Sequence, residues 1–224
     1  LSGELAYGPG AAVGSVLLIP PHPYMGGRMR LPLMNRLAET MASRGLTTLR
    51  FDYGGVGESE GPPIRLGPAM QQFWDTGSAP DDPVHVEEGA MALAWLERTA
   101  GATPALAGYS FGASVAAKIH RPGTPAVALV APTVLRHDYG CFRNEGTPTL
   151  VLFGDGDFAT GEVEMKSWAA ALPGGAMAVN KNGQTYYLSG NTWFQPAFGA
   201  NEPFMNIVKP LATARDVLRQ RLWP

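Results

Sequence analysis

The chain has 224 residues, of which 45% are hydrophobic, and it carries a formal net charge of −2 at pH 7. This length and apolar content fit one globular domain over residues 1–224 with a sizeable core. Without a cluster of Lys or Arg, the chain lacks the electrostatic footprint of a nucleic-acid or anionic-membrane surface, so we expect a monomer or homodimer whose partner is a small molecule.

The single cysteine, Cys141, excludes an internal disulfide framework and favours a reducing, cytoplasmic compartment. No apolar stretch of the sequence reaches the length that spans a bilayer. The glycines near residue 55 do not form a dinucleotide-binding fingerprint, because Glu60 stands where a third glycine is required. We therefore predict neither a cofactor nor a metal.

Apolar runs of strand length alternate with helical patterns along the chain. Such runs are typical of strands buried on both faces, and the alternation predicts a mainly parallel sheet with helices on both sides and the functional crevice at the carboxyl ends of the strands. The predicted strands are 14–20, 46–52, 104–109, 125–131, 147–153 and a last one near 175–180. A first helix is predicted between the first two strands, because Leu33, Leu37 and Met41 fall on one helical face. Two further helices are predicted at 86–101 and 111–119.

Two long segments interrupt this alternation. Residues 61–83 are rich in Pro and Gly and contain Phe73 and Trp74, which predicts a small loop or lid that passes over the pocket. Residues 186–205 are aromatic and are expected to be irregular, and 211–223 read as a closing amphipathic helix.

The stretch "AGYSFGAS" (107–114) predicts a strand that ends in a sharp turn with Ser110 at its tip. Small residues on both sides, in the pattern GxSxG, permit the strained turn that exposes a nucleophilic hydroxyl. Oxyanion donors are predicted at the backbone N–H of Phe111 and in the loop 20–27, at Tyr24 and Met25. A serine hydroxyl is a weak nucleophile at neutral pH, so this motif needs a base.

Five motifs stand out along the chain: "PHPYMGGRM", "LRFDYGGVGESEG", "LAGYSFGASVA", "LVAPTVLRHDY" and "LFGDGD". Together they resemble the small α/β-hydrolases of the dienelactone-hydrolase-like kind over most of the chain. The resemblance implies the α/β-hydrolase fold, with Ser110 as the nucleophile and Asp157, rather than Asp155, as the acid. It would place the family's histidine in a segment that here reads "NGQTYYLSG" (182–190), where Thr185 takes its position.

The four histidines of the chain are candidate substitutes for that base. His120 lies too far along the helix that Ser110 begins, and His85 is expected to face solvent. His22 and His137 both follow predicted strands at the carboxyl edge of the sheet. For His22, a catalytic role and a loop-ordering hydrogen bond both stay open. For His137, which is expected to line the pocket, a structural role is favoured over a catalytic one.

The remaining pocket residues are predicted to be Thr185, Tyr186, Tyr187, Trp74 and Trp193, a largely aromatic wall for an apolar or aromatic substrate with a carbonyl group.

Because the elbow and the acid are present without the usual histidine, the leading hypothesis is non-hydrolytic chemistry. Cyclisation, isomerisation or rearrangement of a small carbonyl compound, for example in secondary metabolism, would use Ser110 and the oxyanion donors for hydrogen bonding. The alternative is a serine esterase, thioesterase or acyltransferase with Ser110, Asp157 and His22. A third hypothesis is a protein that only binds a ligand.

Overall fold

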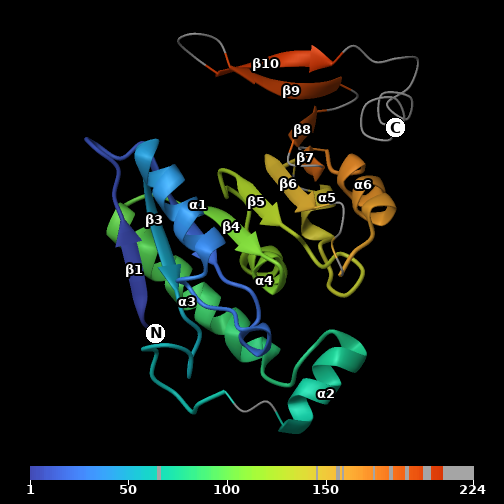
Figure 1. Cartoon of the computed structure of the whole chain (residues 1–224). Coiled ribbons are helices and arrows are strands. Elements are labelled where there is room, and N and C mark those ends of the chain that lie inside the picture. Colours follow the sequence, from blue (N-terminus) through green and yellow to red (C-terminus); the bar gives the residue numbers. More distant parts are fainter. Residues whose placement is uncertain are drawn as a thin grey trace.

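The computed structural model of the chain is built around one sheet with helices on both faces (Figure 1). It describes residues 1–64, 67–144, 146–154, 157, 159–173, 175–181, 184–189, 192–198 and 203–208. Side chains are described as far as residue 173, apart from those of Pro68 and Asn144. Within this part of the chain, the sheet has ten strands in the order β1-β3-β2-β4-β5-β6-β7-β8-β9-β10. The strands are β1 Gly3–Ala6, β2 Gly14–Ile19, β3 Leu46–Phe51, β4 Ala105–Tyr109, β5 Val127–Val130, β6 Thr149–Gly154, β7 Gly175–Lys181, β8 Gln184–Ser189, β9 Thr192–Phe198 and β10 Pro203–Val208.

The parallel centre of the sheet consists of the six strands β3, β2, β4, β5, β6 and β7. These are the six strands that the apolar runs predict, so the expected fold class is confirmed. Antiparallel pairs extend the sheet on both sides, with β1 beside β3 and β8 to β10 beyond β7.

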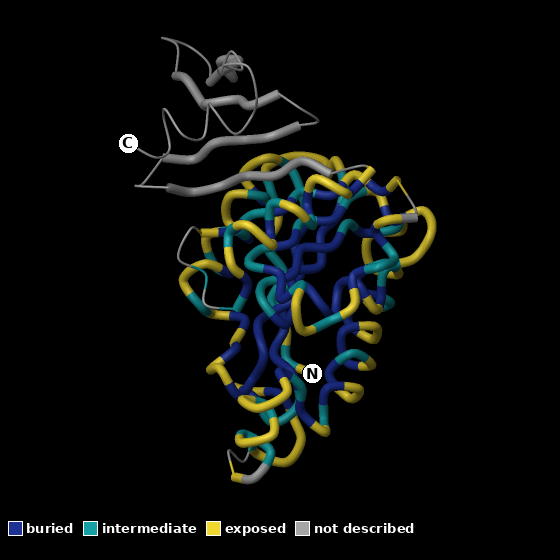
Figure 2. The backbone as a smooth tube through the Cα atoms, turned by 90° about the vertical axis from the view of Figure 1, so that its right-hand side faces the viewer, coloured by how far each residue is buried: buried dark blue, intermediate teal, exposed yellow. Residues whose placement is uncertain are grey.

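The core lies on both faces of the sheet because successive side chains of a strand point to opposite sides. On β2, Leu17 and Ile19 belong to a large cluster that three helices cover, α3 (Asp82–Ala100), α4 (Phe111–Ile119) and α6 (Glu162–Ala170). Val16 and Leu18 belong to a smaller cluster under α1 (Pro32–Ser43). Figure 2 shows the buried strands enclosed by more exposed helices and loops. The helices are α1 Pro32–Ser43, α2 Gly67–Thr76, α3 Asp82–Ala100, α4 Phe111–Ile119, α5 Cys141–Asn144 and α6 Glu162–Ala170, with a short 3-10 turn, η1, at Pro23–Met25.

Two predicted segments differ from the structure. The expectation that 186–205 is irregular is wrong, because strands β8, β9 and β10 occupy most of it. The excursion 61–83 contains a helix, α2, which lies apart from the sheet in Figure 1. The predicted final helix, 211–223, lies outside the described residues.

The first strand, β1, is an edge strand of the sheet and pairs with β3. Glu4 on β1 lies opposite Arg50 on β3, and its carboxylate accepts hydrogen bonds from the guanidinium groups of Arg50 and Arg30. These bonds fix the edge strand to its neighbour. Among the described helices, none combines the length and the apolar character that crossing a membrane requires.

Candidate active site

Ser110 forms the turn between β4 and α4 in a backbone conformation that side chains rarely adopt. Its φ is 55° and its ψ is −117°, as expected for a strained strand-to-helix turn. The Ser110 N–H donates to the Val130 carbonyl at 2.8 Å, which continues the ladder between β4 and β5. The hydroxyl makes no hydrogen bond with another described residue, so it is available to a substrate.

The two glycines of the elbow are required by close backbone packing. A Cβ on Gly108 would lie 2.3 Å from the carbonyl oxygen of Gly112, and one on Gly112 would lie 2.3 Å from the carbonyl oxygen of Ile19. Side chains at either position would force the start of α4 away from the sheet. The GxSxG pattern therefore sets how closely Ser110 approaches the end of β2.

Ser110 opens into a cavity of about 70 Å³. Its walls come from the loop after β2, the C-terminal part of α2, the elbow, and the loops after β5 and β6. Trp74, predicted for the pocket, lies here. The described lining residues are His22, Met25, Phe73, Trp74, Gly77, Ser110, Phe111, Thr133, Arg136, His137 and Ala159.

His137 brings an imidazole into this cavity. Its Nδ1 lies 2.7 Å from the Thr133 hydroxyl oxygen, which in turn lies 3.3 Å from the Tyr139 hydroxyl. Its Nε2 is buried and has no hydrogen-bond partner in the described part of the chain. Burial lowers the pKa of His137 below the ordinary value of 6.5, so the ring is neutral at pH 7. A neutral imidazole with a free nitrogen has the chemistry of a proton acceptor.

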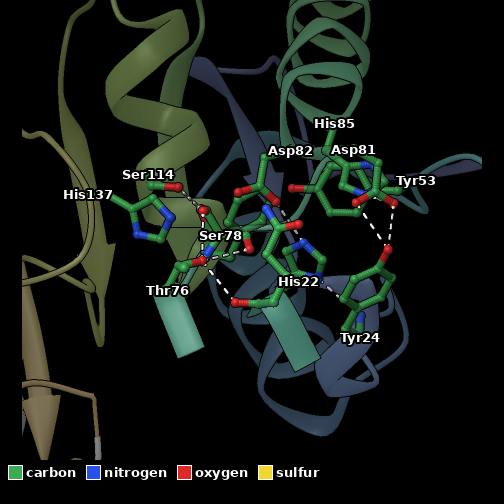
Figure 3. Close-up of polar contacts among 12 residues, drawn as sticks. His22, Tyr24, Tyr53, Thr76, Ser78, Asp81, Asp82, His85, Ser114 and His137 are labelled. Carbon is green, nitrogen blue, oxygen red and sulfur yellow. Dashed lines mark hydrogen bonds and ion pairs between the residues drawn. The ribbon is translucent and has the colours of Figure 1, made fainter. Parts of the chain in front are cut away.

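His22 lines the same cavity, but both of its ring nitrogens have partners. Its Nδ1 accepts the backbone N–H of Tyr24 at 3.0 Å, so the proton resides on Nε2, which donates to the Asp82 carboxylate at 2.9 Å (Figure 3). The side chain is 1% exposed. This geometry argues against His22 as the base for Ser110 and favours the loop-ordering role that the sequence also left open.

A network of buried titratable groups surrounds His22 at the start of α3. Contrary to expectation, His85 does not face solvent: its Nδ1 lies 3.2 Å from Glu88, and its Nε2 lies 3.6 Å from Asp81. The Tyr24 hydroxyl donates to Asp81 from the other side, as Figure 3 shows. Ligand atoms of His22, Asp81 and His85 lie within 4.8 Å of one another. A cation bound to His22 would have to replace either the Tyr24 N–H at Nδ1 or the proton on Nε2 that is donated to Asp82. The bonds present therefore favour a hydrogen-bonded network over a metal site.

Asp157, the predicted acid, is engaged in the turn that follows β6. Its Oδ1 accepts the backbone N–H groups of Ala159 at 2.8 Å and Thr160 at 3.3 Å. The bond to Ala159 holds a residue of the cavity wall, while no described imidazole hydrogen-bonds to this carboxylate. Asp155 lies outside the described residues, and for Thr185, Tyr186, Tyr187 and Trp193 the structure describes the strand but not the side chain.

The predicted oxyanion donors differ in their availability. The N–H of Tyr24 donates to His22 Nδ1, and that of Met25 donates to the carbonyl of His22 at 3.0 Å. Neither N–H is free in this structure. Phe111 is the first residue of α4, where an N–H has no partner within the helix. The Phe111 N–H makes no hydrogen bond with a described residue, so it stays available beside Ser110.

A larger cavity, about 670 Å³, lies away from Ser110 between β1, β3 and α3. Its described lining is apolar apart from Ser2 and Arg98 and includes neither a carboxylate nor an imidazole. The Ser110 cavity is therefore the better candidate for catalysis.

Comparison with known proteins agrees with this architecture. No family model matches the chain. An uncharacterized protein of Rickettsia prowazekii (strain Madrid E) is 26% identical over 148 residues, which cover 63% of this chain and 56% of the Rickettsia protein. The chain thus matches little more than half the length of that relative.

Solved structures with a similar arrangement include a serine hydrolase homologue, a serine hydrolase and an esterase. An alpha-beta serine hydrolase homologue from Coxiella burnetii is 23% identical, with a TM-score of 0.64 over 80% of this chain and 81% of that one. A serine hydrolase without lid from Xanthomonas campestris is 21% identical, with a TM-score of 0.59 over 80% and 76% of the two chains. A cold-adapted esterase from an Arctic intertidal metagenomic library is 18% identical, with a TM-score of 0.56 over 80% and 77%. The chain has the α/β-hydrolase fold.

Sequence reasoning missed Asp82, Thr133 and Tyr139. Asp82 belongs to the pair of aspartates before a proline in "DDPVH" (81–85), a usual composition for the first turn of a helix. Thr133 stands four residues before His137, a spacing at which side chains meet in a helical turn. The carbonyl of Thr133 indeed accepts the N–H of His137.

Proposed function

We propose that the chain is a serine ester hydrolase for a small acyl group, with Ser110 as the nucleophile and His137 as the base. The observation that carries this proposal is the free, buried Nε2 of a neutral imidazole in the same cavity as the strained serine. The fold supports it as well, since the similar solved structures include serine hydrolases and an esterase.

The expected reaction follows from these groups. Nε2 of His137 takes the proton of the Ser110 hydroxyl while Oγ attacks the ester carbonyl carbon. The Phe111 N–H stabilises the resulting oxyanion, and the imidazolium returns its proton to the leaving alkoxide. Water then cleaves the acyl-enzyme by the same route in reverse. In this arrangement Nδ1–H of His137 donates to the Thr133 hydroxyl, so a neutral group orients the base instead of a carboxylate.

The size of the cavity restricts the substrate. At about 70 Å³ it is well below the roughly 300–1,000 Å³ of sites that enclose drug-sized ligands. Phe73 and Trp74 of α2 form its apolar cover. We therefore expect short acyl chains, such as acetyl or propionyl, with the alcohol part of the ester outside the cavity.

Reaction with a fluorophosphonate probe, followed by mass spectrometry of the elbow peptide, tests this proposal. Wild-type protein should be labelled at Ser110 and should hydrolyse p-nitrophenyl acetate faster than the octanoate. His137→Ala should reduce the rate of labelling and the rate of ester hydrolysis about 100-fold or more, because general-base catalysis contributes about 10²- to 10⁴-fold. His120→Gln, at the far end of α4, is the matched control. Unchanged labelling of His137→Ala would refute the assignment.

Non-hydrolytic chemistry on a small carbonyl compound remains a second candidate, on a specific observation. No described imidazole hydrogen-bonds to either Ser110 or Asp157, so the groups of an acyl-transfer triad are not joined. Ser110 and the Phe111 N–H would then polarise a carbonyl for cyclisation, isomerisation or rearrangement without a covalent intermediate. An acyl-enzyme seen by mass spectrometry after rapid quenching with a short ester would count against this candidate.

A further inference from the structure

Among residues 20–25 of the loop after β2, only one backbone N–H makes no hydrogen bond with a described residue. Three of the six residues from 20 to 25 are prolines, which have no N–H. Of the other three, Tyr24 donates to the ring of His22, and Met25 donates to its carbonyl. The N–H of His22 itself makes no hydrogen bond with a described residue. If this loop supplies an oxyanion donor, that donor is His22.

The side chain of His22 fixes the loop on which this N–H lies. Its Nδ1 holds the N–H of Tyr24 at 3.0 Å, and its Nε2–H holds Asp82 at 2.9 Å. Asp82 is the first residue of α3 and is itself buried, so the second bond ties the loop to a long helix. The ring also packs against Phe111, with ring centroids 4.5 Å apart, and against Phe73 of α2 at 4.7 Å.

We propose that the buried His22–Asp82 pair positions the backbone N–H of His22 as the second oxyanion donor, opposite the N–H of Phe111. His22 is then a positioning residue through its ring, and it touches the substrate only through its backbone. This inference rests on the proposed function, because an oxyanion hole matters where a carbonyl is attacked. It also explains why both ring nitrogens are occupied in a histidine that lines the cavity.

His137 and His22 have different roles in this mechanism. His137 moves a proton, so its loss affects every step that needs a base. His22 holds a dipole, so its loss affects the stability of the tetrahedral oxyanion. A donor that acts only on the transition state lowers kcat and leaves KM unchanged. From the usual effect of one oxyanion donor, kcat should fall by about 100-fold in His22→Ala.

The adduct of Ser110 with a ¹³C-labelled trifluoromethyl ketone provides a test. Its readout, the pKa of the hemiketal, does not depend on the overall stability of the protein. The hemiketal oxygen occupies the position of the oxyanion, and the ¹³C shift reports its ionisation as pH is varied. We expect the hemiketal pKa to rise by at least one unit in His22→Ala and in Asp82→Ala. Asp82→Asn should restore the wild-type value, because the amide oxygen still accepts from Nε2–H.

Tyr53→Phe is the matched control. The Tyr53 hydroxyl donates to the carbonyl of Pro20 at 3.2 Å, so this variant also loses a buried bond to the loop without touching the His22 ring. It should lower the melting temperature and leave the hemiketal pKa unchanged. An equal rise in Tyr53→Phe and His22→Ala would reduce the role of His22 to general loop stability and overturn the proposal.

The wild-type protein carries an independent test that needs no variant to fold. On adduct formation the amide proton of His22 should move downfield, whereas the amide protons of Tyr24 and Met25 should stay where they are. A stationary His22 signal in a formed adduct overturns the positioning role and leaves the Ser110 mechanism intact. Failure of wild-type protein to form any adduct overturns the Ser110 mechanism and the positioning role together.

Discussion

Replacement of Gly112 by alanine tests how closely the elbow packs on the end of β2. The new Cβ would lie 2.3 Å from the carbonyl oxygen of Ile19 and 2.5 Å from that of Pro20, where ordinary contact begins at 3.4 Å. Both obstacles are backbone, so α4 must move away from β2 by about 1 Å. Overpacking of this kind costs about 3 kcal/mol at the upper end, and the better helix propensity of alanine offsets about 1 kcal/mol. The free energy of unfolding should therefore fall by about 2 kcal/mol.

Thermal unfolding and ester hydrolysis measure the two consequences. The loss corresponds to a decrease in melting temperature of about 4–8 °C for a chain of this size. Because the Phe111 N–H moves relative to the loop after β2, kcat should also fall about 100-fold, the usual effect of a 1 Å misplacement. Gly67→Ala is the control, since a Cβ there meets nothing within 4 Å. A Gly112→Ala protein with wild-type stability and rate would refute the packing argument.

Three further predictions concern the same site. Ser110→Gly should abolish hydrolysis yet raise the free energy of unfolding by about 1 kcal/mol in denaturant titrations. Glycine adopts the positive φ without strain, and this gain exceeds the cost of its higher entropy in the unfolded state. A lower stability of the variant would contradict the strain at Ser110. The pKa of His137 lies below 6.5 because the ring is buried, so the neutral base persists to lower pH, and kcat/KM should decline only below pH 6.5; a midpoint above 6.5 would exclude His137. Tyr139→Phe should cost about 1–3 kcal/mol in the same titrations, because the buried N–H of Thr133 loses its acceptor, whereas no change would mean that water replaces the hydroxyl.

The parallel centre of the sheet was predictable because burial on both faces leaves a plain signal. Both ends of each strand from β2 to β7 lie within two residues of the ends of the corresponding apolar run. The elbow was predictable for a related reason, since close backbone contacts at Gly108 and Gly112 allow few other residues. In both cases a local pattern reflects a constraint that few alternative structures satisfy.

The outer strands and the buried polar groups left a weaker signal. Strand β1 has only four residues and is half-exposed, so its sequence carries no apolar run. Helix α3 begins at Asp82 rather than 86, and this shift hid the burial of His85, which is 3% exposed. A charged side chain in a sequence usually indicates solvent, and only the tertiary fold shows that several such groups bury one another.

The choice between the two histidines of the cavity could not be made from sequence. Both follow strands that end at the same edge, so spacing gives them equal access to Ser110. The partners distinguish them: His22 meets Asp82, which is 60 residues away, whereas His137 meets a hydroxyl within its own turn. A contact across that separation depends on where α3 begins, which is a property of the whole fold.

The charged pair at the first strand has a consequence for how the molecule meets its neighbours. An outermost strand presents unpaired backbone groups to which a foreign strand can add. A strand docking there would approach Glu4 and its two guanidinium partners. The hydrogen bond from Arg30 lowers the pKa of Glu4, so its carboxylate keeps its charge in mild acid. We expect this charge to disfavour the addition of a foreign strand at the β1 edge, in mild acid as well as at neutral pH.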